Sequence, residues 1–225
     1  MHASLATLTI GQAPRHDIMP LLAAYLPLEQ MVHVGLLDGM SESQIVERYL
    51  PQAGEKVLVS RLQNGAQVRL SARWVEQGLQ QKITELEARG CTLILLLCTG
   101  KFDHLHAEKA LLLEPDRIVP PLISAIVGQH QVGIMVPVKE QVKEQASKWQ
   151  LLAMPPCFAV ASPYQVDEMT LAQAAGALQQ QGAEVVVLDC IGYQQQQRDF
   201  LQARLGIPVL LSNVLMAKLA AELIV

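Results

Sequence analysis

The chain has 225 residues, of which 51% are hydrophobic and 17% charged, and its formal net charge is -4. This composition excludes intrinsic disorder, and the length allows one large or two small domains. The small acidic excess argues against a protein that binds nucleic acids or anionic membranes through its overall charge.

Strands and helices are expected to alternate along the chain. Residues 56–62 and 67–71 flank Asn64-Gly65, a strong signal for a β-hairpin. Pro14 suits the first turn of a helix, and a long amphipathic helix is expected over 72–89. The other predicted strands cover residues 5–10, 31–37, 91–98, 117–119, 131–136, 184–190 and 207–211, and the other predicted helices cover 139–149, 167–181 and the residues from 213 onward. This alternation favours an α/β fold with parallel sheets.

Two segments match each other, residues 90–100 and residues 182–192. Each has a glycine before an apolar strand, a cysteine at the end of the strand and a glycine two residues later, and each is expected to continue into a helix and a short strand. The alternative is that buried parallel strands look alike because they are all rich in Val, Ile and Leu. A duplication also explains the matched cysteines, Cys98 and Cys190, and predicts two lobes with a ligand cleft between them.

A thiol where a strand leads into a helix lies near the positive end of that helix, which favours the thiolate. Cys98 and Cys190 could therefore act on one small molecule as base and acid, the arrangement for two-base racemisation. Alternatively, one thiolate could add to an activated double bond, allow rotation and leave. Both cysteines could instead be small buried hydrophobic residues, as Cys91 and Cys157 are expected to be.

Arg15 lies in the turn after the first predicted strand. Its guanidinium and the N–H groups of a helix start could bind a carboxylate or phosphate. The alternative is a surface arginine paired with Asp17 or Asp38. In the second half of the chain, the loop at Pro137-Val138 is the positional counterpart of this turn.

Other polar residues have more than one interpretation. His104 and His106 form a His-x-His pair without a third ligand at metal-site spacing, so a surface pair on a helix is expected. Asp189, on a buried strand, needs a partner or a function, or accepts hydrogen bonds from backbone N–H groups of its loop. His16, Tyr164 and Tyr193 could line the cleft, whereas Ser60, Arg61 and Arg69 are expected on the solvated face of the hairpin.

The chain starts MHASL, without a basic segment followed by a long apolar one, and no apolar run reaches the roughly 18 residues of a membrane span. We therefore expect a cytoplasmic protein that binds neither membrane nor nucleic acid. The four cysteines form no CxxC pair, which disfavours a zinc ribbon, and in a reducing compartment they are expected to be thiols.

Four separated motifs together resemble the AroM family over the whole chain: TIGQAPRHD at residues 9–17, LLLCTGKF at 95–102, VPVKEQ at 136–141 and LDCIGYQ at 188–194. That family is similar, more distantly, to the aspartate/glutamate racemase superfamily. The resemblance implies two pseudo-symmetric α/β lobes with one catalytic cysteine from each. It also implies activity without cofactor or metal on substrates such as acidic amino acids, hydantoins, maleate or malonates.

This resemblance implies that Cys98 and Cys190 are the catalytic residues and that a small carboxylate is the ligand. It is also compatible with a homodimer. The chain path of the superfamily implies a first lobe of residues 1–117 and 206–225, with a hairpin insertion near 56–71, and a second lobe of residues 118–205. The residues expected to bind substrate flank the two thiols and the two loops: Gln12, Arg15, Thr99, Gly100, Pro137, Val138, Ile191 and Gly192.

The neighbours of the thiols depart from glutamate-type racemases, which carry Asn-Thr after the first cysteine and Thr-His after the second. Here Thr99-Gly100 and Ile191-Gly192 stand at those positions. We expect a cofactor-independent racemase or isomerase that acts on a small carboxylate through two thiols. The alternatives are a catalytically inactive protein that binds or senses a small carboxylate, associated with aromatic amino-acid metabolism, and a redox-sensitive protein that uses its thiols reversibly.

Overall fold

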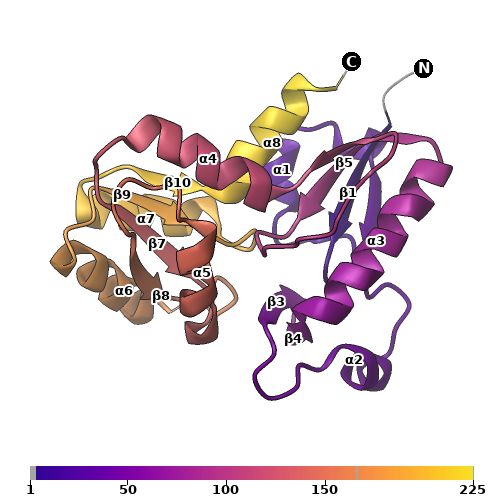
Figure 1. Cartoon of the computed structure of the whole chain (residues 1–225), viewed down its shortest axis with the longest axis horizontal. Coiled ribbons are helices and arrows are strands. Elements are labelled where there is room, and N and C mark those ends of the chain that lie inside the picture. Colours follow the sequence, from indigo (N-terminus) through magenta and orange to yellow (C-terminus); the bar gives the residue numbers. More distant parts are fainter. Residues whose placement is uncertain (1–3, 166, 225) are drawn as a thin grey trace. The chain divides into compact units, whose positions relative to one another are not determined.

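A computed structural model describes residues 4–165 and 167–224, and the chain divides into two compact units (Figure 1). Unit 1 comprises Met1–Pro115 and Met216–Val225, and unit 2 comprises Asp116–Leu215. Residues 1–3, with which the first predicted lobe begins, lie outside the described residues, as do residues 166 and 225.

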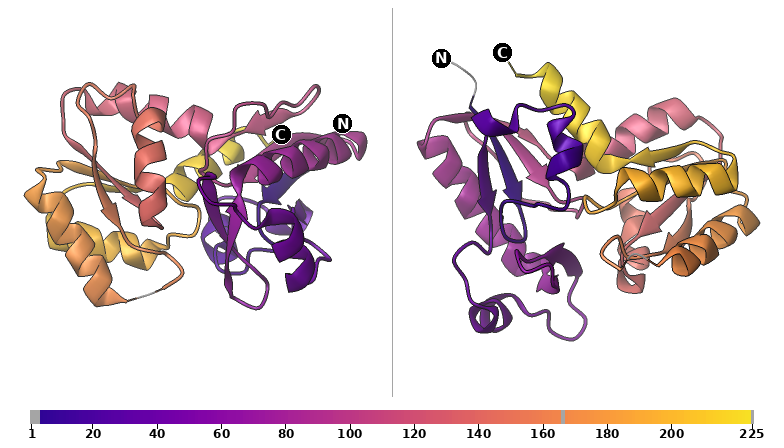
Figure 2. Two further views of the ribbon diagram at one scale, coloured as in Figure 1. Left: turned by 60° about the horizontal axis from the view of Figure 1, so that its bottom comes forward. Right: turned by 180° about the vertical axis from the view of Figure 1, so that it is seen from behind.

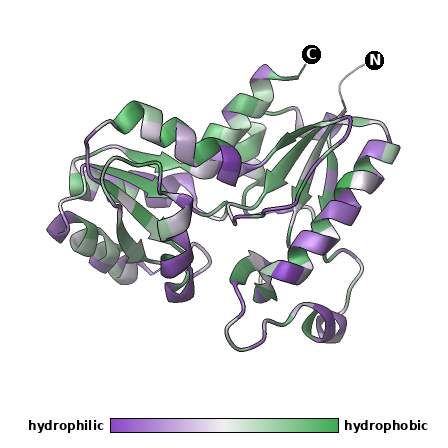
Figure 3. Ribbon diagram, in the orientation of Figure 1, coloured by the Kyte–Doolittle hydropathy of each residue, from purple (hydrophilic) through white to green (hydrophobic). Residues whose placement is uncertain are grey.

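Unit 1 is built on a parallel sheet with the strand order β2-β1-β5-β6. Its strands are β1 (Ser4–Thr9), β2 (Val32–Gly35), β5 (Cys91–Leu97) and β6 (Leu111–Leu113). Every residue of β5 except Thr92 is buried, because the strand lies between β1 and β6. Figure 3 shows the same apolar character along the strands of both units. An unbroken apolar run is typical of a central strand in a parallel sheet.

The helices of unit 1 cover this sheet and flank a hairpin. They are α1 (Met19–Ala23), the 3-10 helix η1 (Leu28–Gln30), α2 (Glu42–Tyr49), α3 (Ala72–Ala88) and the last part of α8 (Ser212–Glu222). The hairpin consists of β3 (Val57–Arg61) and β4 (Gln67–Ser71), which pair antiparallel as Asn64-Gly65 predicts. Figures 1 and 2 show the hairpin and α2 beside the first turns of α3. Within residues 4–165 and 167–224, no helix has the length and apolar character needed to cross a membrane.

Unit 2 repeats the plan of unit 1. Its parallel strands are β7 (Val132–Val136), β8 (Cys157–Val160), β9 (Val185–Leu188) and β10 (Val209–Leu211), in the order β10-β9-β7-β8. Its helices are α4 (Pro115–Val127), η2 (Lys139–Gln141), α5 (Val142–Lys148), α6 (Glu168–Gln180) and α7 (Gln195–Leu205). Written in the opposite direction, this order is β8-β7-β9-β10, which corresponds to β2-β1-β5-β6 in unit 1. Strand β7 therefore takes the place of β1, and β9 takes the place of β5. The predicted α/β fold of two pseudo-symmetric units with parallel sheets is thus confirmed.

Two of the expected elements are wrong. Residues 117–119 lie in α4, which begins at Pro115 with Asp116 in its first turn, both helix-start signals. The strand is β6 instead, and the described residues 98–110 before it contain no helix. The other error concerns Pro14, which follows a cis peptide bond in a loop, while α1 begins at Met19 with Pro20 in its first turn.

The boundary between the units depends on β10. This strand pairs with β9, so residues 209–211 belong to the sheet of unit 2. The chain returns to unit 1 at Met216, inside α8, and not at about residue 206, which the resemblance implies. Strand pairing is decided by the neighbouring strand, which a local apolar pattern does not identify.

Candidate functional site

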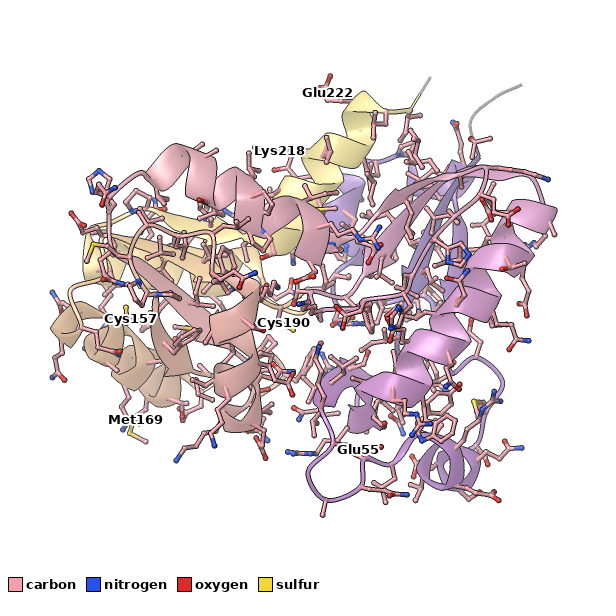
Figure 4. The ribbon with its side chains drawn as sticks, viewed as in Figure 1. Glu55, Cys157, Met169, Cys190, Lys218 and Glu222 are labelled. Atoms are coloured by element: carbon pink, nitrogen blue, oxygen red, sulfur yellow. The ribbon has the colours of Figure 1, made fainter. Side chains whose placement is uncertain are left out.

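The predicted site residues gather at the carboxyl edge of each sheet. In unit 1, Arg15 follows β1 and Cys98 follows the neighbouring strand β5. In unit 2, Pro137 follows β7 and Cys190 follows the neighbouring β9; Figure 4 labels Cys190 in that loop. Each unit therefore brings one thiol close to one of the two loops that were expected to bind substrate. Ligands of open α/β sheets bind at this edge.

Cys98 is the first residue after β5 and only 7% exposed. Its Sγ accepts a hydrogen bond from the N–H of Gly100 at 3.3 Å. A Cβ on Gly100 would lie 2.6 Å from Leu58 Cδ2 and 3.3 Å from Cys98 Sγ, so a side chain at this position would displace Leu58. Thr99 is also buried. Because an N–H donor stabilises a thiolate, this turn is suited to a reactive thiol.

The hairpin lies along the same edge of unit 1. Leu58 of β3 contacts Gly100, which follows β5. Ser60 Oγ lies 2.5 Å from the position that a Cβ would have on Gly11, which follows β1. Residues two apart on a strand face the same side, so one face of β3 covers both loops. Ser60 is fully buried as a result, not on the solvated face that was expected, whereas Arg69 is exposed.

Arg15 is buried, 3% exposed, and paired. Its Nε and Nη2 donate to the two carboxylate oxygens of Asp17 at 2.8 and 2.7 Å. The pairing alternative is thus correct for Asp17, although the pair is not on the surface. Asp38 instead accepts hydrogen bonds from the N–H groups of Ala13 and Gly35 at 2.8 and 2.7 Å. These contacts hold the loop after β1.

Gln12 ties this loop to its surroundings. Its Nε2 donates to the carbonyls of Leu37 and Met40 at 3.3 and 3.4 Å, and its Oε1 accepts from the N–H of Gln63 at 2.9 Å. Beside it lies a pocket of about 340 Å³, lined by residues 12, 14–17 and 61–65 and therefore by the exposed His16. Both walls belong to unit 1, and each carries an arginine, of which Arg15 is paired with Asp17 in the same lining and Arg61 donates from its Nε to the carbonyl of Gly65 at 2.8 Å.

Cys190, two residues after β9, is also 7% exposed. The phenol oxygen of Tyr164 lies 3.8 Å from its Sγ. Tyr193 is fully buried and donates from its hydroxyl to the carbonyl of Ala161 at 2.5 Å. Burial raises the pKa of Tyr193 well above its ordinary value, so this hydroxyl stays protonated.

Asp189 has a buried cationic partner. Lys148 Nζ lies 2.8 and 2.7 Å from its two carboxylate oxygens, and the two side chains are 2% and 0% exposed. The Nε1 of Trp149 lies 3.4 Å from the same carboxylate. Of the interpretations offered by the sequence, a buried partner is therefore the one that the structure supports.

Asn213, at the start of α8, holds the same loop from another side. Its Nδ2 donates to the carbonyls of Ile191 and Tyr193 at 2.7 and 2.8 Å. Sequence reasoning missed both Lys148 and Asn213. A buried aspartate calls for a cation, which was a usable signal, but nothing in the pattern distinguishes Lys148 from the other lysines.

The other predicted residues lie in the loops after β7 and after β5. Pro137 is buried and has no N–H, and Val138 directly precedes η2. Because both side chains are apolar, neither can donate a hydrogen bond to a carboxylate. His104 and His106 are exposed in the loop between β5 and β6, not on a helix. Among the described residues no cluster of three or more His, Cys, Asp or Glu side chains could hold a metal ion. All four cysteines are described and buried, and none is in a disulfide.

Glu87 of α3 fixes the end of the loop that follows Cys98. Its carboxylate accepts hydrogen bonds from the N–H groups of Lys109 and Ala110 at 2.5 and 2.8 Å, and these lower its pKa, the first more strongly. A carboxyl with a lowered pKa stabilises the fold above its ordinary pKa, and this contribution is lost as the pH falls through the folded-state pKa.

We therefore expect Glu87→Gln to lower the urea midpoint at neutral pH, and we expect this difference to disappear as the pH falls through the folded-state pKa of the wild-type carboxyl. The measurement is the urea midpoint as a function of pH. Glu222→Gln, at an exposed position labelled in Figure 4, is the control. Equal pH curves for Glu87→Gln and wild type would contradict the prediction.

A family model described as AroM protein matches residues 5–224. No protein with a curated description matches the chain by sequence. Among solved structures, glutamate racemase isoform RacE1 from Bacillus anthracis is 11% identical with a TM-score of 0.67, over 99% of this chain and 81% of that one.

Two further structures are similar in fold. Allantoin racemase from Klebsiella pneumoniae is 12% identical with a TM-score of 0.60, over 98% of this chain and 87% of the other. Glutamate racemase from Francisella tularensis, solved in complex with D-glutamate, is 11% identical with a TM-score of 0.63, over 99% and 81% of the two chains. At these identities the likeness concerns the fold, and it extends over both units.

Proposed function

The chain belongs to the AroM family, and from this premise we propose that it is a cofactor-independent racemase or isomerase that acts on a small carboxylate through Cys98 and Cys190. The observation that carries the proposal is the matched position of the two thiols. Each follows the corresponding strand of its unit, β5 or β9, and each is 7% exposed. A buried cysteine with only a packing role has no reason to recur at both ligand-binding edges.

In the proposed reaction, one thiolate removes the proton from the carbon next to a carboxylate, and the electrons of that C–H bond move into the carboxylate. The other thiol then delivers a proton to the opposite face of the carbon, and the electrons return to form the new C–H bond. No electron leaves the substrate, so the reaction needs no oxidant or reductant. Support also comes from the solved neighbours, whose names describe racemases of glutamate and allantoin.

The substrate class follows from the same chemistry. A C–H bond next to a carboxylate becomes acidic enough only when donors stabilise the charge that develops on the carboxylate oxygens. Arg61, in the wall of the pocket beside Gln12, is the candidate donor in unit 1, since Arg15 is paired with Asp17. The neighbour solved with D-glutamate supports a small carboxylate as ligand.

The experiment is proton NMR of the purified protein in D2O with a panel of small carboxylates. The panel contains amino acids, hydroxy acids, maleate and malonates, each as separate enantiomers where the compound is chiral. We expect at least one compound to lose its carbon-bound proton signal or to isomerise. Stabilisation of the fold by a carboxylate without any exchange would instead favour the catalytically inactive binding protein.

A further inference from the structure

We propose that the phenol of Tyr164 is the hydrogen-bond donor that stabilises the thiolate of Cys190, and hence a catalytic residue of unit 2. Its oxygen lies 3.8 Å from Cys190 Sγ, within the range of an O–H···S hydrogen bond. The inference rests on the proposed function for its catalytic meaning. Its test, however, reads the thiol directly and requires no turnover.

The phenol reaches the sulfur because residue 192 is a glycine. A Cβ on Gly192 would lie 2.5 Å from Tyr164 Cε1 and 2.7 Å from both Cζ and the phenol oxygen. Real Cβ atoms do not approach other atoms so closely, so any side chain at this position would displace the ring from Cys190. The glycine two residues after the thiol thus has a specific role, which is to make room for the phenol.

The loop that carries Tyr164 is held in place independently of Cys190. The hydroxyl of Tyr193 donates to the carbonyl of Ala161, and Ser162 Oγ accepts a hydrogen bond from the N–H of Tyr164 at 3.2 Å. Tyr164 itself is half-buried. The position of the phenol is therefore built into the fold of unit 2.

Tyr193 and Asp189 lie in the same loop as Cys190, and Lys148 is paired with Asp189; none of these described groups is suited to this role. Tyr193 donates its proton to Ala161, and burial keeps it protonated. Asp189 and Lys148 are engaged with each other at 2.7 Å, and the carboxylate is an acceptor that cannot donate to a thiolate. The phenol of Tyr164 is a donor at the sulfur.

The proton balance is simple. When Cys190 gives its proton to the substrate carbon, the thiolate left behind accepts a hydrogen bond from the Tyr164 O–H, and the phenol keeps its proton. When Cys190 takes a proton from substrate, that hydrogen bond weakens as the neutral thiol forms. Because the donor favours the charged form of sulfur, it lowers the pKa of Cys190.

The test is the rate of alkylation of Cys190 by iodoacetamide as a function of pH in Tyr164→Phe and in wild type. We expect the apparent pKa of Cys190 to rise by about one unit in the variant, with a roughly tenfold slower reaction near pH 7. Cys98 is followed in the same samples by mass spectrometry of its peptide. It should not change, because it belongs to unit 1.

Two further variants make the test specific. Gly192→Ala should shift Cys190 in the same direction, since the added Cβ displaces the ring, and it serves as a second reading if Tyr164→Phe alters the fold. Tyr25→Phe, at an exposed tyrosine of unit 1, should leave both thiols unchanged. Identical Cys190 curves in wild type and Tyr164→Phe, or an equal shift at Cys98, would overturn the proposal. Neither result decides the exchange experiment, which tests the proposed function separately.

Discussion

Replacing either Cys98 or Cys190 by serine is expected to stop inversion of a chiral substrate, with a loss of about 100- to 10,000-fold, while each variant still exchanges the proton of one enantiomer. The reason is geometric. The remaining thiol can remove the proton that faces it and return a deuteron to the same face, but nothing protonates the opposite face. The two variants should therefore select opposite enantiomers.

The measurement uses the substrate found in the exchange panel, supplied as each pure enantiomer in D2O. Proton NMR follows exchange, and chiral chromatography follows inversion. Cys157→Ser is the matched control. Cys157 lies on β8, its Sγ donates to the carbonyl of Val132 at 3.6 Å, and burial raises the pKa of its thiol. Inversion that survives in Cys98→Ser or Cys190→Ser would exclude two-thiol chemistry, as would exchange of both enantiomers by a single variant.

Lys148→Met is expected to reduce the free energy of unfolding of unit 2 by about 3–5 kcal/mol. The substitution keeps the volume of the side chain but leaves the Asp189 carboxylate, which is 0% exposed, without its cation. An uncompensated buried charge costs far more than a lost surface ion pair. Because Asp189 directly precedes Cys190, the same change is expected to loosen the thiol loop.

Urea unfolding followed by tryptophan fluorescence measures this effect. The chain has two tryptophans, and in a Trp74→Phe background the buried Trp149, whose indole lies 3.4 Å from Asp189, reports on unit 2 alone. Lys143→Met on the exposed face of α5 is the matched control and should change little. Adding Asp189→Leu to Lys148→Met should recover most of the loss, since a buried pair replaced by apolar side chains is often neutral. A loss below about 1 kcal/mol in the single variant would show that the pair is dispensable.

The apolar pattern predicted most of the fold because the elements are strongly patterned. The run at residues 91–98 is the buried central strand β5, and Asn64-Gly65 marks the turn of the hairpin, where Gly65 has a φ of 85°. The errors fall where the signal is local and short. Residues 117–119 are as apolar as a short strand, yet Pro115 begins a helix there, and the three-residue β6 precedes it.

The candidate site likewise combines features that the sequence predicted with contacts that it did not predict. The sequence by itself determined the repeat, with Cys98 and Cys190 after matched strands, because parallel strands need apolar runs and their ends carry the polar and reactive residues. It also placed Arg15 in the loop after β1 and named Asp17 as one alternative for its partner.

Only the tertiary structure decided which groups touch the thiols and their loops. Lys148, Tyr164 and Asn213 come from α5, the loop before α6 and the start of α8, and each meets the Cys190 loop across 22 to 41 residues of sequence. The hairpin covers the Cys98 edge by a contact of the same kind, between Leu58 and Gly100. Periodicity along a chain reports which face of an element is buried. Periodicity does not indicate which distant side chain packs against that face, because this contact depends on how the elements pack together.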